Sequence, residues 1–112
     1  MEIVSSVLEG ATVVSIVGTV DSGTASDLAA ALRERVSAPP AHVVADLSGV
    51  DYMSSAGLRA LLENVKEARQ RNGDLRLSGV RPNVLRVLDL SGFTKILKVF
   101  PDAASAAASF AA

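Results

Sequence analysis

The sequence predicts one α/β domain in which a mixed β-sheet packs against helices, with the elements in the order ββαβαβαβα. Three observations predict this fold class. The chain opens with two runs rich in Val and Ile, and it then alternates short apolar runs with segments of helical apolar spacing. Its 112 residues, 49% of them hydrophobic, suffice for one core but not for two. We therefore expect residues 1–112 to form a single domain.

The two opening runs predict a β-hairpin. Ile3 to Leu8 and Ala11 to Val17 are rich in β-branched residues, and Glu9-Gly10 between them is typical of a tight turn. The polar and glycine-containing stretch from Gly18 to Gly23 then interrupts the pattern. The sequence thus predicts that the second strand ends near Val17.

A first helix follows this stretch. Thr24 and Asp27 have the spacing of a capping box, with Asp in place of the usual Glu. Pro39-Pro40 predicts the end of the helix, because proline cannot continue it. Apolar residues recur on one face of this segment: Leu28, Leu32 and Val36.

The middle of the chain carries a buried strand and the strongest helical pattern. The nearly continuous apolar run from His42 to Leu47 indicates a central strand, parallel to a neighbour. After a polar turn and the loop Met53-Ser54-Ser55-Ala56-Gly57, a long amphipathic helix is expected to stop at Gly73. Its apolar face comprises Leu58, Leu61, Leu62, Val65 and Ala68.

The remaining elements are shorter. Leu75 to Ser78 predicts a strand, and Pro82 suits the first turn of a third helix that ends before Gly92. Ile96 to Phe100 predicts a last strand. Pro101-Asp102 then begins an Ala-rich terminal helix.

Composition argues against several classes of function. The formal net charge is −1, from 11 basic and 12 acidic residues spread along the chain, so no basic stripe indicates nucleic-acid binding. The absence of Cys and the single His argue against thiol chemistry, a Cys-based zinc site and a multi-histidine metal site. No segment resembles a signal peptide or a membrane span. We expect a cytoplasmic protein with no cofactor.

The sequence offers two possible chemical sites, and neither is favoured. A hydrolase would need Ser55 as nucleophile and His42 as base, but a six-residue strand rises about 20 Å and separates them. The glycine that a nucleophile elbow requires two residues before the serine is also missing. Asp21, Asp46 and Asp51 follow or end strands and have the chemistry to hold Mg²⁺, but a role in turns and caps is favoured.

The loop from Met53 to Gly57 has two interpretations. Ser54 or Ser55 suits the N-cap of the following helix, where a hydroxyl contributes about 1 kcal/mol. A serine at this position is also suited to phosphorylation, because a helix N-terminus tolerates negative charge. A phosphate there adds a charge of roughly −1.5 to −2 to a nearly neutral surface, and it would weaken the binding of a partner docked on that surface. From the residues alone, both roles stay open.

Three motifs in order resemble those of the STAS domain family, and within it the bacterial anti-sigma factor antagonists. Asp46-Leu47-Ser48-Gly49-Val50 with Met53-Ser54-Ser55-Ala56-Gly57-Leu58 resembles the strand-loop-helix signature of that family. Gly18-Thr19-Val20-Asp21 resembles the G-x-[IVL]-D that follows its second strand. The stretch from Val84 to Phe93 resembles the segment before its last strand. The resemblance covers nearly the whole chain.

The resemblance implies a non-enzymatic regulator. Such antagonists bind an anti-sigma factor, usually a serine kinase, and thereby free a sigma factor; phosphorylation by the kinase ends the interaction and a serine phosphatase restores it. Ser55 then corresponds to the phosphoacceptor and Asp21 to an Asp near the docking surface. Ser54 stands where the family usually has Asp, which makes Ser54 a second candidate acceptor.

The partner surface implied by the resemblance spans the two loops and the exposed side of the long helix. Its residues are Asp21, Ser22, Thr24, Ser54, Ser55, Ala56, Gly57, Arg59 and Asn64. The alternative is a STAS-type accessory subunit of a lipid-transport ATPase, or a stress-signalling scaffold. In that case the same loop docks constitutively and is not phosphorylated.

Overall fold

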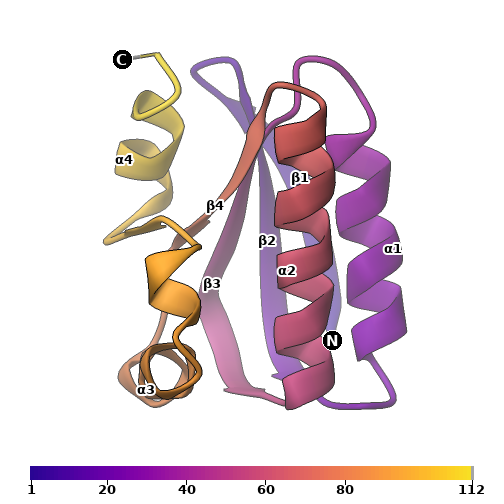
Figure 1. The fold of residues 1–112 in the computed structure, drawn as a ribbon, viewed down its shortest axis with the longest axis vertical. Coiled ribbons are helices and arrows are strands. Elements are labelled where there is room, and N and C mark those ends of the chain that lie inside the picture. The colour runs from indigo at the N-terminus through magenta and orange to yellow at the C-terminus, as the bar shows by residue number, and fades with distance from the viewer. Residues whose placement is uncertain (112) are drawn as a thin grey trace.

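A five-stranded sheet in the order β1-β2-β3-β4-β5 forms the centre of the structure, a computed structural model that describes residues 1–111 (Figure 1). The first strand is antiparallel to the second, and all other neighbours are parallel. The strands are β1 (Glu2–Leu8), β2 (Ala11–Val20), β3 (His42–Met53), β4 (Asp74–Ser78) and β5 (Val99–Phe100). The helices are α1 (Ala25–Val36), α2 (Ser55–Gln70), α3 (Pro82–Leu90) and α4 (Ala103–Ala108), with a short 3-10 turn at Phe93–Lys95. The expected fold class and element order are confirmed.

The opening hairpin forms as predicted. Glu9 and Gly10 have φ values of 50° and 81°, the left-handed pair of a type I′ turn, whose twist matches that of the flanking strands. The predicted end of β2 at Val17 is wrong. Pairing with β3 continues to Val20, whose fully buried side chain adds to the core.

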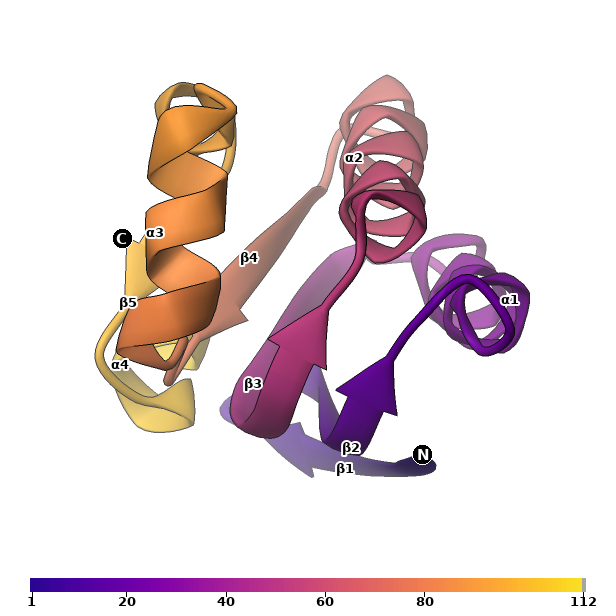
Figure 2. The same ribbon diagram turned by 90° about the horizontal axis from the view of Figure 1, so that it is seen from below.

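The helices cover the sheet unequally. Seen from below, α1 and α2 lie together over one face of the sheet (Figure 2). The small helix α4 covers part of the other face, where Ala106 and Ala107 pack against Val13 and Val44. The main core lies under α1 and α2, and its largest fully buried side chains include Ile16, Leu28, Leu32, Leu47, Leu61, Leu75 and Leu77. The expected apolar faces of α1 and α2 are therefore confirmed, except that Leu62 is only half-buried.

Strand β3 is twice as long as its apolar run suggests. The segment from Ser48 to Met53, expected to be a polar turn, stays in the sheet because it pairs with the end of β2. Gly49 permits close pairing here, since a Cβ on it would lie 2.8 Å from Cγ2 of Val17. Register shifts accompany this extension. Only Ser54 separates β3 from α2, so the expected loop shrinks to one residue.

The C-terminal part of the structure differs from the sequence-based prediction in one element. The predicted strand from Ile96 to Phe100 shortens to Val99–Phe100, because the amide of Leu97 donates to the carbonyl of Phe93 at 2.8 Å and keeps that stretch in a turn. Helix α4 begins as expected after Asp102, whose Oδ1 accepts from the amide of Ser105 at 2.7 Å. This backbone bond, with a further one from the side chain of Ser105, holds the pKa of Asp102 below its ordinary value.

Across residues 1–111, the helices lack the length and apolar character needed to cross a lipid bilayer.

Candidate functional site

The carboxyl ends of β2 and β3 meet the first turns of α1 and α2 at one edge of the sheet. Figure 2 looks onto this edge, where β2 leads into α1 and β3 leads directly into α2. The amide nitrogen of Ser54 donates to the carbonyl oxygen of Val20 at 2.8 Å and joins the two strand ends. The sequence motifs around Asp21 and Ser55, more than 30 residues apart, therefore lie on one surface.

The structure gives the two adjacent serines different roles. Ser54 is the N-cap of α2: its backbone is extended and its hydroxyl accepts from the amide of Gly57 at 3.3 Å. Ser55 is the first helical residue and is exposed, and within residues 1–111 its hydroxyl makes no hydrogen bond. The cap interpretation is thus confirmed for Ser54, and Ser55 is the serine left accessible.

Gly57 lets α2 approach the strand ends closely. A Cβ on this residue would lie 2.8 Å from Cγ of Met53 and 2.8 Å from Cγ1 of Val20. The glycine itself is buried, so it shapes the site through spacing rather than through surface contact. Its neighbour Ala56 is half-buried.

Asp21 orders the loop that leads into α1. Its Oδ1 accepts from the amides of Gly23 at 2.9 Å and Thr24 at 3.0 Å, and its carbonyl accepts from Ala25 at 2.9 Å. The predicted capping box is wrong: the Thr24 hydroxyl makes no cap bond with α1 and instead accepts from the amide of Asp21 at 3.0 Å. Asp21 and Ser22 stay exposed on this ordered loop.

A groove of about 250 Å³ separates α1 from α2 next to Ser55. Its floor is alanine and its rim is polar, with exposed Arg59 and Glu63 from α2 and exposed Ser26 from α1. The lining residues are Ala25, Ser26, Ala29, Ala56, Arg59, Ala60 and Glu63. The sequence-based surface missed the α1 side of this groove. The sequence signal that could have predicted it is a pair of alanines four residues apart in each helix, which lie on one helix face.

Asn64 does not belong to this surface. The expectation that it lies on the exposed side of α2 is wrong, because only 3% of it is exposed. Its side-chain amide donates to the carbonyls of Ala29 at 3.3 Å and Ala60 at 2.9 Å. Asn64 therefore joins α2 to α1 and fixes the spacing of the groove.

The other polar candidates are separated by the fold. His42, at the start of β3, stacks on Phe110 with ring centroids 4.7 Å apart, and the full length of β3 separates it from Ser55. Asp51 accepts from the hydroxyl of Thr19 at 2.8 Å, and Asp46 accepts from Ser48 and Ser78. Asp21 serves the turn role expected of it. Within residues 1–111, no group of three His, Cys, Asp or Glu side chains is placed to hold a metal ion.

Comparison with known proteins agrees with this architecture. The family model described as the STAS domain matches residues 2–106. The chain is 37% identical over 110 residues to the Bordetella bronchiseptica protein named "Putative anti-sigma factor antagonist BtrV", covering 98% of this chain and 95% of that protein. An anti-sigma factor antagonist from Mycobacterium paratuberculosis has a similar crystal structure, with a TM-score of 0.87, 27% identity and coverage of 96% and 92%. A sulfate transporter family protein from Wolinella succinogenes is also similar, with a TM-score of 0.76, 25% identity and coverage of 93% and 87%.

Proposed function

The chain belongs to the STAS domain family, and we propose that it is an anti-sigma factor antagonist controlled by phosphorylation of Ser55. In the unmodified state it binds an anti-sigma factor of the serine kinase type in the cytoplasm and so releases a sigma factor. Phosphorylation of Ser55 by that kinase ends the interaction, and a serine phosphatase restores it. The protein itself is a regulator and not an enzyme.

The hydroxyl of Ser55, exposed and without a hydrogen bond to the described part of the chain, is the observation that carries this proposal. Ser54, the other candidate, is half-buried and its oxygen already accepts the amide of Gly57. A kinase that used Ser54 would have to act on a half-buried hydroxyl and displace this cap bond. Ser55 has no such bond among the described residues, which favours it as the acceptor.

The position of Ser55 suits a switch that leaves the fold intact. A phosphate on the first residue of α2 faces the positive end of the helix macrodipole and free backbone amides. Arg59 lies one turn further along, exposed and within reach of a charge at Ser55. The modification is therefore expected to change the surface charge and not the stability.

The groove between α1 and α2 completes the proposed partner surface. Its small alanine floor admits side chains from a partner, while Arg59 and Glu63 offer charges of both signs at the rim. The exposed loop from Asp21 to Gly23 and the phosphoacceptor lie beside it at the same edge of the sheet. A phosphate at Ser55 would have to be desolvated by any partner seated there, which weakens binding.

Mass spectrometry of the intact protein tests the assignment. Incubation with the cognate kinase and ATP is expected to add one phosphate, retained in Ser54→Ala and lost in Ser55→Ala. Phosphate that persists in Ser55→Ala and disappears in Ser54→Ala would move the acceptor to Ser54.

The alternative of an unphosphorylated accessory subunit has one supporting observation. A domain of the same fold occurs in a sulfate transporter family protein, so the fold alone also fits a subunit of a lipid-transport ATPase or a scaffold. Purification from the native host distinguishes the two functions. An anti-sigma factor bound to the unmodified chain supports the antagonist, whereas a transport complex that survives Ser55→Glu supports the subunit.

A further inference from the structure

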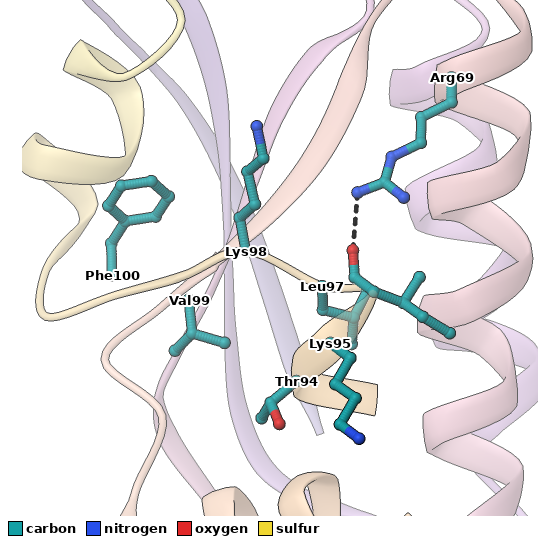
Figure 3. Close-up of a pocket in the computed structure, with 8 residues that line it drawn as sticks. Arg69, Thr94, Lys95, Leu97, Lys98, Val99 and Phe100 are labelled. Carbon is teal, nitrogen blue, oxygen red and sulfur yellow. Dashed lines mark hydrogen bonds between the residues drawn. The ribbon is translucent and has the colours of Figure 1, made fainter. Parts of the chain in front are cut away.

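A second and larger groove lies far from Ser55. It has a volume of about 610 Å³ and separates the last turns of α2 from the segment that joins the 3-10 turn to β5 (Figure 3). Arg69, its contribution from α2, is 14 residues beyond Ser55, which corresponds to about 21 Å along the helix. The groove is therefore separate from the proposed partner surface.

The lining side chains carry positive charge without a carboxylate among them. Arg69, Lys95 and Lys98 line the groove, and the last two are two of the three lysines in a chain whose net charge is −1. Within residues 1–111, neither lysine forms an ion pair. The groove thus gathers three positive side chains, of which the two lysines have no carboxylate partner among the described residues.

Arg69 is held in place by two bonds. Its Nε donates to Oδ1 of Asp74 at 2.9 Å, and its Nη2 donates to the carbonyl of Ile96 at 2.7 Å. Asp74 is shared with Arg76, whose Nε lies 3.1 Å from the other carboxylate oxygen, so this carboxylate does not neutralise the pair. The guanidinium is therefore fixed, and its positive charge stays at the rim of the groove, where it can attract a carboxylate or phosphate.

Charge and apolar surface are separated within the groove. Figure 3 shows the side chains of Arg69 and Lys98 on one side of the segment, with Lys95 and Thr94 directed to the other side. Phe100, half-buried and on the same side as Lys98, supplies the apolar surface, whereas Val99 points to the opposite side and packs against the main core. An anion with an apolar body matches this division, because its charge and its body each meet the corresponding surface.

We propose that this groove binds a small organic anion. Its carboxylate or phosphate group lies between Arg69 and Lys98, and its apolar body lies against Phe100. This site is independent of the proposed function, since it uses neither Ser55 nor the groove between α1 and α2.

Titration of the full chain, followed by the chemical shifts of its backbone amides, tests the proposal. The probes are phenyl phosphate, phenylacetate and inorganic phosphate. We expect saturable changes confined to residues 94–100 and the C-terminal turns of α2. Both organic anions should bind about 10-fold or more tightly than inorganic phosphate, because the ring removes apolar surface from water. The organic anion that binds more tightly shows whether phosphate or carboxylate is the preferred group.

Lys98→Gln is the diagnostic variant, because Arg69 also supports Asp74 and Ile96. This substitution should weaken the binding of both organic anions about 10-fold, as expected for loss of a charge-assisted hydrogen bond. Lys66→Gln is the matched control: it removes the same charge from α2 outside the groove, and binding should stay within about twofold. Ser55→Ala should bind the anions unchanged.

Four outcomes would overturn the site. Absence of saturable changes at about 10 mM probe would mean that no binding site exists. Equal affinity for inorganic phosphate and phenyl phosphate would indicate an adventitious ion only. Equal losses of affinity for the organic anions in Lys66→Gln and Lys98→Gln would indicate a general charge effect. Tighter binding of a short Asp- and Glu-rich peptide than of either organic anion would make the groove a protein-docking site instead.

Discussion

The hydroxyl oxygen of Ser54 accepts a hydrogen bond from the backbone amide of Gly57 at 3.3 Å and so caps the first turn of α2, which the backbone bond from Leu58 to the carbonyl of Ser54 also holds at 3.0 Å. The cap bond also distinguishes two chemically identical neighbours, since Ser55 has an exposed hydroxyl with no such task. The structural role and the proposed regulatory role therefore fall on different residues and can be separated by substitution.

Ser54→Ala is expected to lower the free energy of unfolding by about 1 kcal/mol, because it leaves a helix amide without its cap. Ser55→Ala is expected to change it by less than about 0.5 kcal/mol, as is usual for an exposed position. Urea denaturation followed by circular dichroism measures both. Equal losses in the two variants would contradict the assignment of the cap to Ser54 alone.

Ser55→Glu should mimic the phosphorylated state. The added charge lies at the N-terminus of α2, so the thermal midpoint should stay near that of the unsubstituted protein. Binding to the anti-sigma factor should weaken about 100-fold, which corresponds to roughly 2.7 kcal/mol of lost interaction. Calorimetric titration measures this, with Ser55→Ala as the uncharged control. Unchanged affinity in Ser55→Glu would remove the phosphorylation switch from the proposal.

Asn64→Ala should destabilise the protein by about 2 kcal/mol, because a buried amide that joins α2 to α1 is lost together with its packing. Asn83→Ala is the matched comparison. Asn83 also donates to a backbone carbonyl, that of Asp51 at 2.7 Å, but it is exposed and water can replace the bond. Its loss should cost under about 1 kcal/mol. Denaturant unfolding of both variants gives the two values.

Asp102 should contribute a pH-dependent part of the stability. Its pKa is held below the ordinary 3.8 by the bonds from Ser105. The carboxylate is therefore favoured in the folded state, and its contribution is present above the unfolded pKa and lost as the pH falls through the lowered folded pKa. The stability of the protein relative to Asp102→Asn should therefore fall over this acidic range, because only the carboxylate titrates. Urea midpoints measured from pH 7 down to about 2 test this; a constant difference would show that ionisation of Asp102 is irrelevant.

Local chemistry predicted those elements whose signals are contained in a few neighbouring residues. Glu9-Gly10 specified a hairpin turn, and the apolar spacing in α2 specified its buried face. The extension of β3 to Met53 depends instead on pairing with β2, some 30 residues earlier in the chain, while its own composition mixes polar and apolar residues. Asn64 similarly looked exposed because its partner, the carbonyl of Ala29, belongs to another helix.

The same distinction applies to the site. The motif identified Ser54 and Ser55 as candidates. The hydrogen bond that gives them different roles can be assigned only once the structure shows that α2 begins at Ser55. The α1 wall of the groove was missed because alanines carry no chemical signal of their own. Close packing of two helices gives them their role.

The single-residue connection between β3 and α2 has a consequence for the kinase. Most of the residues around Ser55 are committed to a strand on one side and to a helix on the other. A kinase that binds its substrate as an extended, flexible segment would therefore not find such a segment around Ser55. The kinase proposed to modify Ser55 is therefore expected to recognise a three-dimensional surface, and a synthetic peptide spanning residues 46–61 should be a poor substrate even though it contains the whole motif.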